Sequence, residues 1–341
     1  MTTLSTHQPA AGPRLAALTR SEALRARSRR SLFWLCLLSI VAILGIAAIT
    51  WFTTAHVTGA QLDTAMADFR AEQQLYYEQC MADVGETGGD CWQPTEADVV
   101  ANAAWYLPHQ PFGQDSLNGL VSFAGGIGLL VALLFAATTG GADWGARTMG
   151  LLLSWEPRRT RVFLVRIALA VLIAVAVELA LVALAAGIGW GIGGAHGIDP
   201  DVATRLADTY RAPDLAATTE LVLRWLPLTA LAAAGSFGVA MLTRSTGWAI
   251  GASIGFVAVV ETVLQLAWPW ASQWLVQTNM LAWLQGGRLQ MVSRQPVVYD
   301  DAAIAPGVIM ITDTRALLTL SVIAALAVLA GWIALVRRDV E

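Results

Sequence analysis

The chain contains no lysine, and all 21 of its basic residues are arginines. The phosphate-binding loop of the common nucleoside triphosphatases needs the lysine of its G-x-x-x-x-G-K-[ST] motif, so this chain cannot carry such a site. Charged residues of both signs are also scarce, at 13% of a 341-residue chain that is 56% hydrophobic. Because a soluble domain carries about 25% charged residues, the composition indicates a membrane protein with several spans.

Histidine and cysteine are rare as well. The histidines are His7, His56, His109 and His196. Their spacing lacks the i, i+4 pairs of a helical metal site, so we expect no metal site. No pattern of nucleophile, base and acid predicts a catalytic site, and no cofactor site is expected. Cys36 lies inside an apolar run, where we expect it to be an inert apolar residue.

Six apolar runs are long enough to cross a bilayer as helices. The expected spans are residues 32–54, 117–139, 162–190, 220–243, 246–268 and 315–336. The predicted fold class is therefore an all-α polytopic membrane protein, with residues 1–341 forming one transmembrane domain. Residues 1–31 are polar and arginine-rich, and we do not expect a cleavable signal there. Within them, residues 15–30 form either a helix lying on the bilayer or a disordered basic tail.

Arginine is distributed unevenly between the two sides that these spans define. Fourteen arginines and five acids lie on the side of the two termini and the loop of residues 140–166, whereas seven arginines and 18 acids lie on the other side. The positive-inside rule therefore predicts that both termini are cytoplasmic and that the chain crosses the cytoplasmic membrane. Tryptophans near both ends of the spans, such as Trp34 and Trp51, fit the aromatic belts of such a protein.

The loops expected outside the cell are residues 55–116, 191–219 and 269–314. The first is acidic, with ten carboxylates, and looks helical over residues 61–79. Cys80 and Cys91 follow, and an oxidising compartment favours a disulfide between them over two free thiols or pairing between subunits. In the third loop, the apolar segment 274–284 is too short to cross and predicts an interfacial or re-entrant helix.

Two carboxylates, Glu178 and Glu261, lie deep within expected spans, where an unpaired charge is costly. They either line a transport path or pair with an arginine such as Arg224, or they make structural hydrogen bonds inside the bundle. Glycines also mark positions inside spans. Gly247, Gly251 and Gly255 recur every fourth residue, which predicts close helix packing within the subunit or across a dimer.

A G-x-G-x-x-G spacing occurs at residues 189–194. It follows an apolar span rather than a strand, so we do not interpret it as a dinucleotide-binding loop.

The loop of residues 140–166 reads GGADWGARTMGLLLSWEPRRTRVFLVR. An apolar stripe at helical spacing predicts an amphipathic helix at the membrane surface over residues 140–156. The stripe consists of Trp144, Thr148, Leu151, Leu152 and Trp155. Asp143 is placed to cap this helix and to pair with Arg147, and Pro157 ends it. The basic residues that follow are Arg158, Arg159, Arg161 and Arg166.

This loop resembles the intracellular loop between the second and third spans of type-2 ABC exporter permeases. In that family an acidic residue precedes a Gly-Thr pair, an apolar run, and a proline with basic residues. Here the corresponding residues are Asp143, Arg147-Thr148, Leu151-Leu152-Leu153 and Pro157-Arg158-Arg159. The departures are aspartate for the usual glutamate, and Arg147 for glycine. The six spans extend the resemblance over most of the chain, and the ending at residues 335–340 is also similar.

The resemblance implies an exporter permease subunit that works as a dimer with two separate ATPase subunits, which bind ATP and magnesium. The helix 140–156 would then sit in a groove of the ATPase, and ATP-driven closure would push it and tilt the spans. Trp144, Leu151, Leu152 and Trp155 are the expected apolar anchors, to the ATPase or to the bilayer, and Asp143, Arg147 and Glu156 are the expected polar contacts on the ATPase side. The alternative for this helix is an interfacial anchor that docks no partner. No nucleic-acid partner is expected.

Two other function classes stay open. One is an ion-coupled secondary transporter that works through Glu178 and Glu261, although no repeat between the halves supports an inverted-repeat architecture. The other is a non-transporting immunity or sensor subunit, whose acidic outer loop binds a ligand. Neither the substrate nor the choice between homodimer and heterodimer follows from the sequence.

Overall fold

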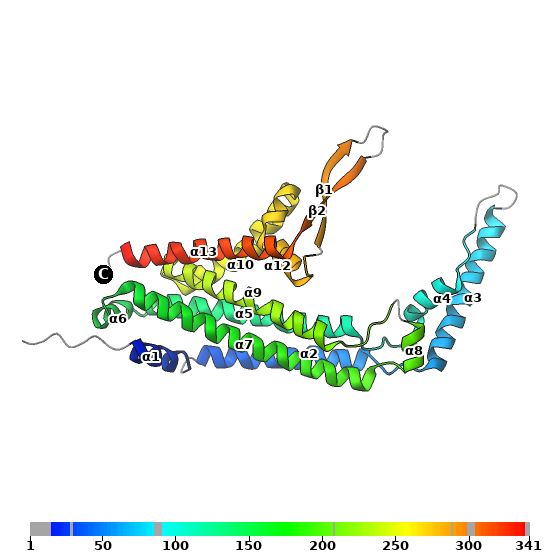
Figure 1. Ribbon diagram of the computed structural model, residues 1–341, viewed down its shortest axis with the longest axis horizontal. Helices are drawn as coiled ribbons and strands as arrows, with labels where there is room; N and C mark the ends of the chain where they lie inside the picture. The colour runs from blue at the N-terminus through cyan, green and yellow to red at the C-terminus, as the bar shows by residue number, and fades with distance from the viewer. Residues whose placement is uncertain are drawn as a thin grey trace, which may run out of the picture. The chain divides into compact units, whose positions relative to one another are not determined.

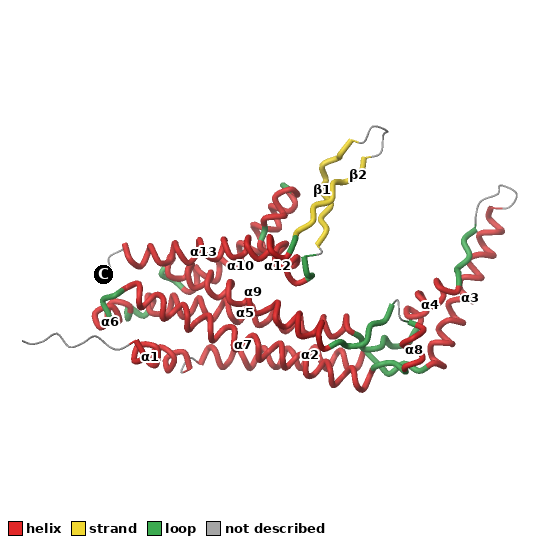
Figure 2. Tube along the Cα trace, viewed as in Figure 1, coloured by secondary structure: helices red, strands yellow, loops and turns green. Residues whose placement is uncertain are grey.

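The computed structural model confirms an all-α polytopic membrane protein (Figures 1 and 2). The structure describes residues 15–27, 30–84, 91–206, 209–287, 289–298 and 304–337. Within these ranges, six helical segments are long and apolar enough to cross a membrane. They are α2 (Arg30–Thr53), α5 (Gln114–Gly145), α7 (Arg159–His196), α9 (Leu215–Thr243), the segment Thr246–Ala267 and α13 (Asp313–Arg337). Each of the six predicted spans is therefore confirmed, with some boundaries extended by several residues.

The chain forms two compact units, and each is described here by itself. One unit comprises residues 1–39, 125–180 and 223–341, and the other comprises residues 40–124 and 181–222. We refer to them as the large unit and the small unit.

The small unit contains the first two predicted outer loops. Helix α3 (Gly59–Val84) confirms the predicted helix, and it packs with α4 (Glu96–Ala103), the short 3-10 helix η2 (Ala104–Tyr106) and α8 (Pro200–Arg205). Their shared core consists of buried Val57, Leu62, Ala65, Met66, Phe69, Val99, Ala103, Leu107, Val202 and Leu206. This core explains why a loop rich in carboxylates folds, because the helices bury one apolar face and leave the acidic face in water.

Polar contacts reinforce the small unit. Arg205 bonds Asp63 at 2.7 Å between α8 and α3. Thr95 begins α4 with a capping box, and the hydrogen bonds that its hydroxyl and backbone N–H donate lower the pKa of the Asp98 carboxyl. Cys80 and Cys91 lie at disulfide geometry, with their Cα atoms 5.9 Å apart, as the sequence predicts.

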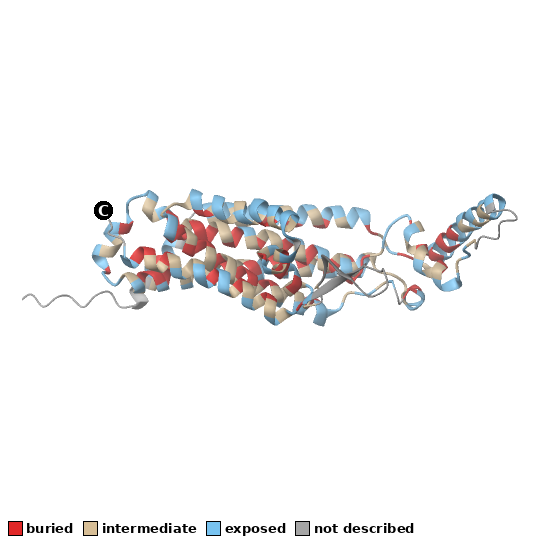
Figure 3. Ribbon diagram, turned by 90° about the horizontal axis from the view of Figure 1, so that it is seen from above, coloured by how far each residue is buried: buried red, intermediate tan, exposed pale blue. Residues whose placement is uncertain are grey.

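The large unit is built on α5, α7, α9 and α13. One buried core of this unit consists of Ala132, Ala136, Met149, Phe163, Ala170, Ala174, Ala233, Phe237, Met241 and Leu335. Many of these are small, which lets helices approach closely. A Cβ atom added to Gly331 of α13 would lie 2.4 Å from the carbonyl oxygen of Gly238 of α9. Figure 3 shows buried positions on one side of the long helices and exposed positions on the other.

The predicted fifth span has a composite backbone. Helix α10 (Thr246–Gly255) passes into a π-helix, η3 (Phe256–Glu261), and then into α11 (Thr262–Ala267). Only 11% of the residues in its apolar stretch are buried. Cβ atoms added to Gly247, Gly251 or Gly255 would meet no atom of the described chain within 4 Å. Of the two alternatives, close packing of these glycines within the subunit is not formed among the described residues, and packing across a dimer stays a prediction.

The predicted third outer loop is mixed in structure. A 3-10 helix, η4 (Pro269–Trp274), leads into α12 (Val276–Leu284), which confirms that the short apolar segment is helical. An antiparallel hairpin follows, with β1 (Leu289–Val298) paired to β2 (Ile304–Ile311). The sequence does not predict this hairpin, because Pro296 and Pro306 lie opposite one another in it and neither can donate a backbone hydrogen bond.

Residues 15–27 form helix α1 (Leu15–Arg27), and the prediction that this helix lies on the bilayer stays a prediction. Residues 1–14 of the predicted polar N-terminal segment lie outside the described residues. The C-terminal residues 338–341, which carry part of the family resemblance, also lie outside them.

Candidate functional site

The loop between α5 and α7 is the candidate site, and its backbone differs from the prediction. Helix α5 continues to Gly145, and a separate short helix, α6 (Met149–Trp155), follows. The prediction of one continuous helix over residues 140–156 is therefore wrong. Asp143 lies inside the last turns of α5 rather than at a helix start.

A residue in the left-handed backbone conformation separates α5 from α6. Arg147 has φ of 56°, a left-handed conformation that glycine adopts most easily. The N–H of Thr148 donates to the Asp143 carbonyl at 2.9 Å, and the N–H of Arg147 donates to the Trp144 carbonyl at 3.1 Å. These two bonds form a Schellman motif, which usually carries glycine at the left-handed position. Since arginine occupies that position here, the usual sequence signal for the end of α5 is missing.

The predicted apolar stripe is split between buried and exposed side chains. Trp144 is half-buried against the core of the large unit, with the Arg244 guanidinium 4.5 Å from its ring centroid. Leu152 also packs against that core. Leu151 and Trp155, four residues apart on α6, instead expose 65% and 75% of their surface. The loop therefore presents a two-residue apolar surface, Leu151 and Trp155, outside the helical core.

The polar residues of the loop are also divided. Arg147, Thr148, Pro157 and Arg158 are exposed. Glu156 is only 4% exposed, and its carboxylate lies 3.5 Å from Arg161, so its expected contact with an ATPase does not form in this conformation. Arg159 donates to the carbonyl oxygens of Leu335 and Val336 at the end of α13, each at 3.2 Å.

Arg166 lies at the centre of a buried ion cluster that joins three helices. Its guanidinium forms an ion pair with Asp143 of α5, and it lies 3.8 Å from the Glu22 carboxylate of α1. It also donates to the carbonyl oxygen of Thr139, and its exposed fraction is 3%. The predicted pair of Asp143 with Arg147 is therefore wrong, because Asp143 pairs with Arg166. Sequence reasoning missed Glu22, since nothing in the pattern of α1 indicates contact with α7.

Glu261 has a structural environment. Its carboxylate is fully buried and accepts hydrogen bonds from the backbone N–H groups of Val276 and Gln277, at 2.5 and 2.9 Å. These are the free N–H groups of the first turn of α12, so Glu261 caps that helix from a neighbouring segment. Among the alternatives left open for Glu261, these contacts therefore support structural hydrogen bonds inside the bundle.

Glu178 has a sparser polar environment. It is fully buried on α7, and its carboxylate oxygens make no hydrogen bond of regular geometry among the described residues. The polar group beside it is the Thr229 hydroxyl of α9, which also donates to the Trp225 carbonyl at 3.0 Å. Gly128 of α5 leaves the space that it occupies, because a Cβ atom there would overlap the Glu178 carboxylate. Of the alternatives left open for Glu178, a pair with Arg224 is not formed, since the Arg224 guanidinium bonds Asp313 at 3.2 Å and the Trp283 carbonyl at 2.7 Å.

The glycine motif and the histidines singled out in the sequence lie in ordinary helices and hydrogen-bonded contacts. Residues 189–194, with the G-x-G-x-x-G spacing, lie within α7, so they form no glycine-rich turn. Among the described residues, no group of three or more histidine, cysteine or acidic side chains is arranged to hold a metal ion. His56 bonds Asp199 at 3.0 Å, and His196 bonds the Thr54 hydroxyl at 3.0 Å. His7 lies outside the described residues.

Neither a comparison with protein-family models nor a comparison with curated proteins finds a match to this chain, so the functional argument rests on its own residues.

Proposed function

We propose that the chain is the membrane-spanning subunit of an ATP-driven exporter, and that a separate ATPase docks on the loop between α5 and α7. The observation that carries this proposal is the exposed apolar surface of Leu151 and Trp155 on α6. The exposed arginines Arg147 and Arg158 flank this surface in the sequence. Exposed aromatic and aliphatic side chains with nearby arginines are typical of protein interfaces.

The backbone supports the resemblance to type-2 ABC exporter permeases at one position. Those proteins carry glycine where this chain carries Arg147, and Arg147 adopts the left-handed conformation that glycine favours. Thr148, the next residue of the same pair, is the N-cap residue of α6. This chain therefore has arginine in place of the family's glycine at position 147, but its backbone there keeps the left-handed conformation that suits glycine.

The composition requires a second chain for ATP use, since no lysine is present for a phosphate-binding loop. In the proposed complex, ATP and magnesium bind to the ATPase, and two copies of the permease or two related permeases form the pathway. The uneven distribution of arginine supports an orientation with the loop and both termini in the cytoplasm and the chain in the cytoplasmic membrane. The small unit would then be extracellular, where its disulfide is stable.

The contacts of the loop suggest how motion would pass from the ATPase to the spans. A push on α6 reaches the end of α5 directly through the chain. The ion pair of Asp143 with Arg166 links that end to α7, and Arg159 links the start of α7 to the end of α13. Three candidate spans thus converge behind one short exposed helix, so the displacement of α6 would move them together.

The docking proposal is tested with the double variant Leu151→Ala and Trp155→Ala. A truncated interface anchor costs about 2 kcal/mol or more, which weakens association about 30-fold. We expect normal expression and membrane insertion, but loss of a co-purifying P-loop ATPase and of its permease-dependent ATP hydrolysis. The variant Trp248→Ala with Leu326→Ala is the matched control, because it removes two similarly exposed side chains from α10 and α13. Wild-type ATPase recovery and hydrolysis in the double variant would reject docking at α6.

A second candidate function is ion-coupled transport, and the environment of Glu178 favours it. Only the Thr229 hydroxyl lies beside this buried carboxyl, and an ionised carboxyl with so little polar contact is costly in a membrane span unless it binds a proton or a cation at some stage. Glu261 gives this candidate less support, because its carboxylate is occupied by the start of α12. Transport by the purified chain without any ATPase would favour this candidate over the exporter.

A further inference from the structure

Three helices of the large unit meet around the side chain of Glu178, at the middle of α7. The exposed fraction of this residue is 0%. Gly128 of α5 leaves the space for its carboxyl group, because a Cβ atom at position 128 would overlap that group. The Thr229 hydroxyl of α9 lies beside it. A polar group that is enclosed in this way needs a hydrogen-bond partner, and the partner that the structure offers is Thr229.

The hydroxyl proton of Thr229 is already in use. The hydroxyl donates it to the Trp225 carbonyl, one turn earlier in α9, at 3.0 Å. A threonine hydroxyl has one proton and two acceptor lone pairs, so towards Glu178 it can only accept. An ionised carboxyl also only accepts. Two acceptors that face each other form no hydrogen bond, in agreement with the absence of a regular hydrogen bond at either Glu178 oxygen among the described residues.

A proton on Glu178 removes this conflict. The neutral carboxyl has an O–H group, which donates to the Thr229 oxygen while Thr229 continues to donate to the Trp225 carbonyl. The result is a chain of two hydrogen bonds that runs from α7 to the backbone of α9. Hydrogen bonds in such a chain strengthen one another in a low-dielectric interior. The neutral form also avoids the cost of an unpaired charge inside a span.

No opposite charge faces Glu178 from the helices around it. Residues 116–142 of α5 and 225–243 of α9 contain no titratable side chain, and Glu178 is the only one within residues 167–195 of α7. Arg224 and Glu220 precede Thr229 by five and nine residues in α9, which turns them about 140° and about 180° away from it. The Arg224 guanidinium bonds Asp313 instead. An ionised Glu178 would therefore stand without a counter-charge among the described residues.

A metal cation fits this site less well than a proton does. Hard cations such as Ca²⁺ take about six to eight oxygen ligands. The side-chain oxygens that the described residues bring together here are those of Glu178 and Thr229. The Nε1 atom of Trp225 is also buried without a hydrogen-bond partner among the described residues, but it is a donor and repels a cation.

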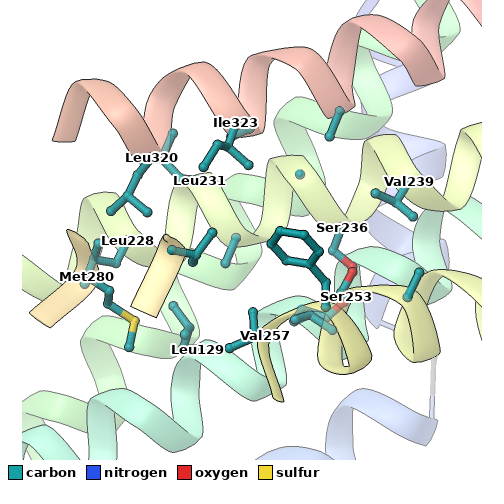
Figure 4. Close-up of a pocket in the computed structure, with 18 residues that line it drawn as sticks. Leu129, Leu228, Leu231, Ser236, Val239, Ser253, Val257, Met280, Leu320 and Ile323 are labelled. Atoms are coloured by element: carbon teal, nitrogen blue, oxygen red, sulfur yellow. The ribbon is translucent and has the colours of Figure 1, made fainter. Parts of the chain in front are cut away.

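The site is also separate from the apolar groove of the large unit. Leu129 of α5 and Leu228 of α9 line that groove, and they are the sequence neighbours of Gly128 and Thr229 (Figure 4). Successive helical residues point about 100° apart, so the two leucines face away from the side that meets α7. Glu178 is not among the residues that line the groove. An enclosed site of this kind suits a proton, which needs no free volume.

We propose that Glu178 is a proton-binding site of the large unit, and that its carboxyl O–H donates to the Thr229 hydroxyl oxygen. This inference names the ion for the second candidate function, and as a statement about transport it rests on that function. As a statement about binding it concerns the folded chain alone. Release of the proton needs an acceptor such as water at the carboxyl, so it requires α5 or α9 to move away from α7.

Infrared absorption of the purified chain, in a detergent without carbonyl groups, measures this proton directly. A protonated carboxyl has a C=O stretching band that a carboxylate lacks, and the band shifts in D₂O. Exposed aspartates and glutamates, whose usual pKa is about 4, are ionised at neutral pH, so the band then reports enclosed acids. We expect the band in the wild type from about pH 6 to about pH 8, and its loss in Glu178→Gln.

Glutamine is a suitable replacement because its amide N–H donates to Thr229 as the acid does. The matched controls are Glu261→Gln and Glu156→Gln. Both of these glutamates are buried, but one carboxylate accepts two backbone N–H groups and the other lies beside Arg161, which favours the ionised form. We expect both control variants to keep the band at its wild-type intensity.

The hydrogen-bond partner is tested separately. Thr229→Val removes the acceptor with little change of shape, whereas Thr229→Ser keeps a hydroxyl. We expect the C=O band to shift in Thr229→Val and to stay in place in Thr229→Ser. An unshifted band in Thr229→Val would overturn the assigned partner.

The proton site itself can fail in three ways. The band would be absent from the wild type at neutral pH, or it would survive in Glu178→Gln, or it would disappear when sodium replaces a bulky organic cation at constant pH. The last result would assign the site to a metal cation. A band with all the expected properties, in a chain that transports nothing without an ATPase, would leave this inference standing while the second candidate function fails.

Discussion

Arg166 of α7 and Asp143 of α5 form an ion pair in which the arginine is almost completely enclosed. Glu22 of α1 lies close to the same guanidinium. Removing one member of a buried pair leaves the other charge unpaired, which costs about 3–5 kcal/mol. We therefore expect Arg166→Met to lower the thermal stability of the purified protein strongly, and to weaken the attachment of α1.

A double-mutant cycle separates the ion pair from other effects of losing Arg166. Asp143→Asn removes the matching charge, so the double variant should recover part of the stability that Arg166→Met loses. Arg147→Met is the control, because Arg147 is exposed and makes no pair with Asp143. Simple addition of the two single-variant effects would show that the pair contributes no coupling energy.

The orientation of the chain is tested with single cysteines. In a Cys36→Ala background, a cysteine at Thr148 should be protected from a membrane-impermeant thiol reagent in intact cells. A cysteine at Gln93, an exposed position of the small unit, should react. Both should react once the cells are opened. The opposite pattern would reject the assigned orientation together with ATPase docking at α6.

The two buried glutamates should respond differently to the same substitution. Glu261→Gln replaces an acceptor of two backbone bonds by a group with a single acceptor oxygen, so the variant should lose about 1.5–3 kcal/mol of stability. Glu178→Gln should change stability by less, because its carboxylate accepts no backbone hydrogen bond among the described residues and has only the Thr229 hydroxyl beside it. Thermal unfolding in detergent measures both, and equal losses would contradict the assigned roles.

The disulfide should be found in protein from an oxidising compartment. An unreduced digest should contain the peptides of Cys80 and Cys91 joined together, and reduction should separate them. The bond closes a short loop, so its loss should cost the small unit about 3 kcal/mol at most. Alkylation of both cysteines before reduction would contradict the pairing.

The sequence predicts the spans because long apolar runs have few alternative structures. It predicts their ends less well, as α5 and α7 show. Helix α5 runs to Gly145 and α7 to His196, whereas the apolar runs suggest ends at 139 and 190. The helix continues there because glycine-containing and polar turns still satisfy the α-helical hydrogen bonds, which an apolar pattern does not register.

The sequence predicts a helix in the loop between α5 and α7, and the structure contains the short helix α6 there, but the details of the loop differ. The Schellman turn was missed because its left-handed residue is Arg147 rather than glycine. The partner of Asp143 was missed because local spacing suggested Arg147, whereas Arg166 approaches from the next span. Contacts of this kind depend on how helices pack, and short-range spacing along one helix does not contain that information.

The π-helix at Phe256–Glu261 fixes the rotational phase of the residues after it. One residue advances an α-helix by about 100°. A π-helix winds more slowly, so its six residues here turn through about the same angle as five α-helical residues. The wider turn therefore absorbs one residue, and Glu261 keeps the direction that brings its carboxylate to the first turn of α12. Homologous chains that lack one residue between positions 256 and 260 should form a regular α-helix and still direct a carboxylate at position 261 towards α12.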